Sequence, residues 1–223
     1  MAPAAGSARP RPLLVELVGP PGAGKSTVFE GLLRDGRIEP RPILRRREPS
    51  SLAVWNLLAA LLLLGRHRML NRSMTWLLPE LAYLRALPKL LDRRPPERIV
   101  VFDQGPIFLL TRPQVLVPRL ARWRNSTFDT WSSLLDVIVL LEAPDDVLIE
   151  RINARSQVHR VKGSTAATAT EFLADHRAVF REPLERLDRA EGTTVLRFDT
   201  SSRSAEEVVE DVVARLTTLR AAR

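Results

Sequence analysis

The chain alternates short apolar runs with longer segments in which apolar residues recur at helical spacing. Four runs indicate buried strands, at 13–18 (LLVELV), within 97–106, at 136–144 and at 193–200, and a further strand is placed at 41–49. Helical spacing is found at 26–35, over much of 52–92, at 107–134 with breaks, and at 145–155. Strands alternating with helices are typical of a parallel sheet. The pattern therefore predicts an α/β fold, with a parallel five-stranded sheet covered by helices on both faces.

Two further helices are predicted from their N-terminal signals. Thr168 and Glu171 have the spacing of a capping box that opens a helix near 169, and Pro183 is expected to kink or end that helix. Ser204 and Glu207 have the same spacing in front of an apolar repeat, which predicts a helix over 205–221.

The longest apolar run, SLAVWNLLAALLLLG at 51–65, is shorter than the roughly 20 residues that a membrane-spanning helix needs. It also contains Asn56. We therefore expect a buried helix rather than a membrane contact. Residues 1–12 have no apolar core, which is unlike a secretory signal, and are expected to form a flexible tail. The rest, 13–223, is expected to form a single domain in the cytoplasm.

The composition narrows the chemistry. The chain has no cysteine, which excludes disulfides and thiolate metal sites, and its three histidines are scattered, so we expect no zinc site. The formal net charge is +8, but the basic residues are spread along the chain without the interleaved aromatic residues of single-strand binders. This distribution favours small anionic substrates over nucleic acid.

The most specific motif is VGPPGAGKST, at 18–27. It matches the nucleotide-binding pattern GxxxxGK(S/T) between a predicted strand and a predicted helix, as that motif requires. Successive backbone N–H groups of such a loop surround phosphates, and the helix N-terminus adds its dipole. Lysine is a compact charge that fits within the ring of amides. The predicted nucleotide-binding residues are Gly19, Pro20, Pro21, Gly22, Ala23, Gly24, Lys25, Ser26 and Thr27.

Within this loop, Lys25 is expected to reach the β- and γ-phosphates of ATP, Ser26 to ligate Mg²⁺, and Thr27 to contact the α-phosphate. Asp103 follows the apolar run IVVF, so it is expected at the end of a strand beside the loop, where it can hold Mg²⁺ directly or through water. The next residue is Gln104, whereas motor-type ATPases usually have a glutamate there that activates water. This difference argues against ATP hydrolysis as the purpose of the site.

Several motifs together resemble thymidylate kinases and deoxynucleoside kinases of the P-loop NTPase superfamily. These are RREPSSLAVWN (46–56), VVFDQGP (100–106), VIVLLEAPDDVLIERINAR (137–155), TEFLADHRAVF (170–180) and VLRFDTSSRSAEEVVEDV (195–212). The resemblance covers about 13–215 and implies a three-layer P-loop NTPase fold, with a helical acceptor-side region at about 52–92 and a lid at about 156–168. The chain departs from the family at two positions: Gln104 replaces an arginine, and Val18 replaces a glutamate, with Glu16 two residues earlier.

The resemblance also implies roles for residues outside the loop. Arg155 and Arg160 become catalytic lid candidates that neutralise charge on the transferred group, with Arg151 and Lys162 as weaker ones. Glu48, just before Pro49, becomes a candidate base for a hydroxyl acceptor, although it could equally pair with the arginines at 45–47. His159 lies in the same segment, and a solvated loop histidine is favoured there over a catalytic one. Trp55, Tyr83 and Arg85 could line the acceptor pocket, although aromatic and apolar residues at helical spacing usually belong to the core.

The sequence thus predicts an ATP- and Mg²⁺-dependent phosphotransferase acting on a small-molecule acceptor. Two alternatives stay open: an ATP-binding switch or adaptor without kinase activity, whose 52–92 region docks a partner or a membrane surface, and a nucleic-acid-linked ATPase. The identity of the acceptor, the choice between ATP and GTP, and the formation of a homodimer are also open.

Overall fold

The computed structural model describes residues 11–34, 38–40, 50–68, 78–91, 95–190 and 192–222. The sheet consists of β1 (Leu13–Val18), β2 (Ile38–Pro40), β3 (Ile99–Phe102), β4 (Val137–Glu142) and β5 (Thr194–Asp199). The helices are α1 (Lys25–Leu32), α2 (Ser50–Arg66), α4 (Leu78–Leu91), α5 (Pro106–Leu110), the 3₁₀ turn η1 (Pro118–Leu120), α6 (Ala121–Ser132), α7 (Asp145–Ala154), α8 (Ala166–Arg189) and α9 (Ala205–Ala221).

The strands lie in the order β2-β3-β1-β4-β5, and all neighbours pair in parallel. Every side chain of β1 and β3 is buried, as expected of apolar runs covered on both faces. β2 is a three-residue edge strand that ends at Pro40, so it lies before the segment 41–49 to which the sequence assigned a strand. That segment lies outside the described residues.

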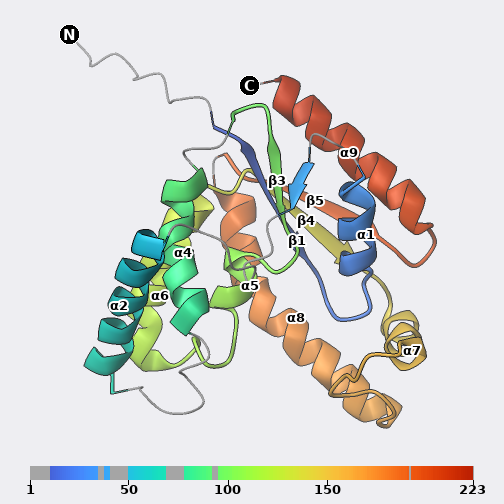
Figure 1. Cartoon of the computed structure of the whole chain (residues 1–223). Helices are drawn as coiled ribbons and strands as arrows, with labels where there is room; N and C mark the ends of the chain where they lie inside the picture. Colours follow the sequence, from blue (N-terminus) through green and yellow to red (C-terminus); the bar gives the residue numbers. More distant parts are fainter. Residues whose placement is uncertain are drawn as a thin grey trace.

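Helices cover both faces of the sheet (Figure 1). One core lies under α1 and α9 and includes Leu17, Val139 and Val212. The other lies under α4, α5 and α6 and includes Val18, Leu140 and Trp131. The predicted layered α/β fold with a parallel sheet is thus confirmed.

Helix α2 differs from the buried helix that its apolarity predicted. Ala60 and Leu64 are fully buried, but Trp55 is 71% exposed and Leu62 is 66% exposed. The reason is its position, because α2 packs on α4 at the margin of the molecule, so only its inner face is covered (Figure 1). No helix in the described part of the chain is long and apolar enough to cross a membrane.

The predicted caps are partly correct. Ser204 and Glu207 form the expected capping box of α9. Helix α8, however, begins at Ala166, because Thr165 is its N-cap and accepts a hydrogen bond from the N–H of Thr168. The helix also continues past Pro183 to Arg189. Buried Phe180 and Leu187, on either side of the proline, anchor the helix to the core and offset the lost hydrogen bond.

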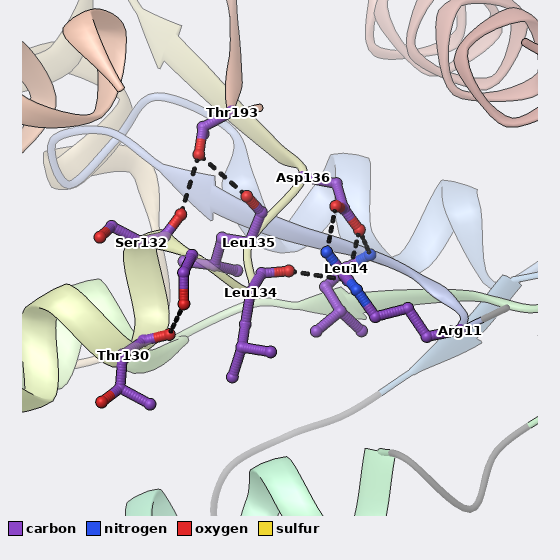
Figure 2. A network of polar contacts seen from close by, with 9 residues as sticks. Arg11, Leu14, Thr130, Ser132, Leu134, Leu135, Asp136 and Thr193 are labelled. Atoms are coloured by element: carbon purple, nitrogen blue, oxygen red, sulfur yellow. Dashed lines mark hydrogen bonds and ion pairs between the residues drawn. The ribbon is translucent and has the colours of Figure 1, made fainter. Parts of the chain in front are cut away.

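The N-terminal end of β1 is fixed by a buried carboxylate (Figure 2). Asp136, 3% exposed, accepts hydrogen bonds from the guanidinium of Arg11 at 3.0 and 2.8 Å and from the N–H of Leu14 at 2.7 Å. Arg11 also donates to the carbonyl of Leu134. Arg11, which the sequence analysis assigned to the tail, is therefore part of the folded domain.

We predict that Asp136→Ala lowers the free energy of unfolding by about 3 kcal/mol, because the N–H of Leu14 loses its acceptor in a buried place. Urea unfolding followed by circular dichroism measures the change. Asp129→Ala is the matched control, since it removes an exposed ion pair with Arg186 and should cost less than about 1 kcal/mol. Equal effects of the two substitutions would contradict the assigned role of Asp136.

Candidate functional site

The phosphate-binding loop occupies residues 19–24 between β1 and α1. Gly24 is the N-cap of α1 with a φ of 85°, a left-handed conformation that favours glycine. Gly19 and Gly22 also have positive φ values, and both pack against backbone: a Cβ would lie 2.1 Å from the carbonyl oxygen of Leu141 at Gly19, and 2.8 Å from that of Leu148 at Gly22. The loop thus needs glycine for its close approach to β4 and α7.

Lys25 opens α1 and folds back over the loop. Its ammonium donates to the carbonyl oxygens of Gly19 at 2.6 Å and Pro20 at 2.8 Å. Burial lowers its pKa to about 8, with a further lowering by Arg155, against an opposing effect of Asp103. The ammonium therefore carries most of its charge at neutral pH and lies in the electrostatic range of both groups. The structure brings together these three predicted site residues.

Asp103 directly follows β3, which pairs with β1, so its position beside the loop follows from the parallel register. Burial raises the pKa of its carboxyl group, Lys25 acts in the opposite direction, and Glu30 of α1 raises it further. Ser26 and Thr27 are exposed in the first turn of α1. Ser26 and Asp103 thus offer oxygen ligands next to the loop.

Glu16 is a site-forming residue whose role the sequence analysis missed. It lies within β1 and is fully buried. Its two carboxylate oxygens accept hydrogen bonds from the N–H groups of Ile107 at 3.0 Å and Phe108 at 2.8 Å, in the first turn of α5. Gly105 lies directly against it, because a Cβ there would be 2.3 Å from the carboxyl carbon of Glu16. Glu16 therefore fixes the segment that carries Asp103.

A cavity of about 330 Å³ opens beside the loop, between α1, the end of α7 and the connection from β5 to α9. Arg151 lines it and donates to the hydroxyl of Thr200 at 3.0 Å and to its carbonyl at 2.7 Å. Arg203 is held by the carboxylate of Asp211 at 2.9 Å. The principal lining residues are Gly22, Gly24, Thr27, Arg151, Arg155, Thr200, Arg203 and Ser204.

No protein-family model matches the sequence, and no curated protein matches it. Among solved structures, the chain is similar to the YorR protein of Bacillus subtilis, solved in complex with phosphorylated GDP, at 17% identity and a TM-score of 0.52, over 94% of this chain and 98% of that one. Deoxyadenosine kinase from M. mycoides, solved with bound dCTP, matches at 15% identity and a TM-score of 0.49, over 92% and 100%.

The chain shares its fold with the YorR protein. The layered α/β architecture with a parallel sheet that the resemblance implied is therefore confirmed. In this fold, the loop after β1 and the end of β3 lie where the sequence predicted the phosphate-binding loop and Asp103.

The lid candidates divide into two groups. Arg155 lines the cavity and lies in the electrostatic range of Lys25. Arg160, in contrast, is exposed, and its guanidinium lies over the ring of Phe172 at 6.0 Å. Lys162 is exposed too and donates to the carbonyl oxygen of Arg155. In this conformation, neither of these two side chains joins the phosphate site.

Other contacts attach the predicted lid segment, 156–168, to α8. His159 packs edge-on against Phe172, with ring centroids 5.5 Å apart, and Val161 is buried. Burial is the largest cause that lowers the pKa of His159, followed by Arg155 and Lys25. The imidazole of His159 therefore packs on Phe172 of α8.

Four remaining candidates, Glu48, Tyr83, Trp55 and Arg85, receive no support for a direct role. Glu48 lies outside the described residues, and so does the side chain of Tyr83. Trp55 and Arg85 are exposed on α2 and α4. Thr200 and Arg203 line the cavity but were not predicted from the sequence, because the loop that carries them follows β5 and is far from the motif in sequence. A lone acidic residue in LLVELV is the one signal that points to Glu16.

We predict that Glu16 makes folding pH-dependent. Burial, the largest effect, raises its pKa from 4.5 to about 7 despite the N–H groups of Phe108, Ile107 and Gly105. Between these values the unfolded chain releases a proton that the folded chain keeps, so stability falls as the pH rises through this window. The total change is about 3 kcal/mol.

The measurement is urea unfolding of the wild type and of Glu16→Gln, which cannot titrate, at about pH 5 and about pH 8. The wild type should lose stability relative to the variant on going to the higher pH. Glu142→Gln, which alters an exposed carboxylate at the end of β4, is the control and should leave the profile unchanged. A slope of opposite sign would mean that the N–H groups outweigh burial.

Proposed function

We propose that the protein is an ATP- and Mg²⁺-dependent phosphotransferase that moves the γ-phosphoryl group to a small-molecule acceptor, as in thymidylate and nucleoside kinases. The observation that carries this proposal is the convergence of Lys25, Asp103 and Arg155 at a glycine-rich loop beside a cavity of about 330 Å³. Phosphoryl transfer needs positioned charge more than covalent chemistry.

The residues at the loop suit both ATP and Mg²⁺. The backbone of 19–24 and the N-terminus of α1 suit phosphates, and the cavity lined by Arg151 and Thr200 has a size suited to a nucleoside. Ser26 and Asp103 suit Mg²⁺, which takes few protein ligands and keeps phosphate oxygens and water. Among the described residues no larger cluster of acidic or histidine side chains forms a metal site. When bound, Mg²⁺ would neutralise charge on the phosphates.

In the proposed mechanism, the chain's own residues supply positioned charge. The ammonium of Lys25 and the guanidinium of Arg155 neutralise negative charge that develops on the transferred group. Asp103, held in place through Glu16 and Gly105, would hold Mg²⁺ directly or through water. Glu48 is the candidate base for a hydroxyl acceptor, whereas a phosphate acceptor needs none.

A second candidate function rests on the exposed apolar side chains of α2, Trp55 and Leu62 above all. It is an ATP-binding switch or adaptor that docks a partner and transfers no phosphoryl group. The two functions differ in one measurable respect, since only a phosphotransferase consumes ATP in proportion to an added acceptor.

The test is ATP turnover by the purified protein with nucleosides, nucleotides, sugars and aminoglycosides as acceptors. We predict that Lys25→Ala lowers the maximal rate about a hundredfold or more and leaves the fold intact. Lys25→Arg should also be poor, since the planar fork does not fit the ring of amides. Lys89→Ala, an exposed lysine on α4, is the matched control. A Lys25→Arg enzyme with wild-type turnover would contradict the proposed role.

Glu48 reports on the type of acceptor. If the acceptor is a hydroxyl, Glu48→Gln should lower the maximal rate about a hundredfold with ATP affinity kept, because the attacking oxygen loses its base. Steady-state kinetics and ATP titration measure the two effects. Normal turnover of this variant would leave Asp103 as the candidate base or point to a phosphorylated acceptor.

A further inference from the structure

Exposed apolar side chains are concentrated on one helix. Of the eight large hydrophobic residues that are exposed in the described part of the chain, five belong to α2. We call them the α2 outer face: Trp55 (71% exposed), Leu57 (38%), Leu58 (45%), Leu61 (37%) and Leu62 (66%). Contiguous exposed apolar surface of this kind marks an interaction site, whereas single exposed residues need no explanation.

The α2 outer face is a continuous surface. Trp55, Leu58 and Leu62 recur at the three- and four-residue spacing of one helical stripe, and Arg66 continues the stripe at its C-terminal end. Leu57 and Leu61 lie beside it. The opposite side of the helix, with Ala60 and Leu64, is buried in the core. The stripe therefore faces away from the body of the protein and runs along a helix about 25 Å long.

The surroundings of this face are basic. In sequence, residues 50–132 contain twelve arginines and lysines against five aspartates and glutamates, so most of the chain's net charge of +8 lies in this segment. Helix α2 contains no acidic residue, and Arg66 and Arg68 are exposed at its C-terminal end. Helix α4, on which α2 packs, exposes Arg85 and Lys89 (Figure 1).

The combination of apolar and basic groups indicates which partner would cover the α2 outer face. A second copy of the chain would bring two basic regions together, and like charges oppose that contact. An acidic protein would satisfy the arginines but does not by itself require a stripe of leucine and tryptophan. The interface of an anionic bilayer accepts both, because leucine enters the acyl boundary, tryptophan lies at the headgroup level and guanidinium groups meet lipid phosphates.

We propose that the α2 outer face binds the surface of an anionic lipid bilayer, with α2 lying in the plane of the interface. The helix has 17 residues and does not meet the requirements of a spanning segment. Binding is therefore peripheral and reversible, and it weakens with salt because part of it is electrostatic. This inference does not depend on the proposed phosphotransferase activity.

The test is sedimentation of the full chain with vesicles of phosphatidylcholine alone and of phosphatidylcholine mixed with phosphatidylglycerol. We expect binding to the mixed vesicles, weaker binding at high salt, and a blue shift of tryptophan fluorescence that is lost in Trp55→Phe. Leu62→Glu should lower the partition coefficient at least about tenfold, since a carboxylate enters the apolar interface. Leu33→Glu, which alters a 40% exposed leucine at the end of α1, is the matched control and should bind normally.

Several results would overturn the proposal. One is equal sedimentation with and without phosphatidylglycerol, and another is no sedimentation with either vesicle. A third is a dimer, detected by light scattering, that dissociates in Leu62→Glu, because a second copy of the chain would then cover the face. Circular dichroism of each variant establishes that the fold is kept, and Leu58→Asn, a milder change on the same stripe, replaces Leu62→Glu if that variant unfolds.

Discussion

The arrangement of the candidate phosphate site depends on one buried carboxylate. Glu16 lies in the central strand β1, where no water reaches it, and its oxygens accept the first N–H groups of α5. A carboxylate in such a place is costly unless it is hydrogen-bonded, and helix N-terminal amides are favourable partners. The contact joins the strand that leads into the phosphate-binding loop to the segment that follows β3. The hydrogen bonds of Glu16 therefore fix the position of Asp103 relative to the loop that carries Lys25.

The packing around the loop leaves no room for a side chain at two glycines. Gly105 contacts the carboxyl group of Glu16, and Gly19 contacts the backbone of β4. These two contacts keep the carboxyl ends of three neighbouring strands, β3, β1 and β4, close together. Because backbone contacts of this kind are stiff, the loop is shaped before any ligand binds, which lowers the ordering cost of binding.

The sequence predicted those features that depend on local pattern. The bounds of β1 and α9 agree with the predictions, since an uninterrupted apolar run and a Ser–Glu capping box are complete signals in themselves. The helix α2 was predicted as an element, but its exposure was not, because exposure depends on how many neighbours a helix finds. Arg160 is an example of the same limit: its contact with Phe172 arises from the packing of the lid against α8, which no spacing encodes. Thr200 and Arg203 reach the cavity only through the order of the strands.

The cavity beside the loop is built from segments that are far apart in sequence, with Gly22 on one wall and Val208 of α9 on another. Helix α9 packs on α1 so closely that a Cβ at Gly31 would lie 2.5 Å from a methyl carbon of Val209. During synthesis, the chain therefore presents the phosphate-binding loop long before this wall exists. Contacts of such long sequence separation form late in folding. A ribosome-bound chain that has not yet released α9 therefore has the residues of the loop but lacks this wall of the cavity, and the core under α1 and α9 is still incomplete.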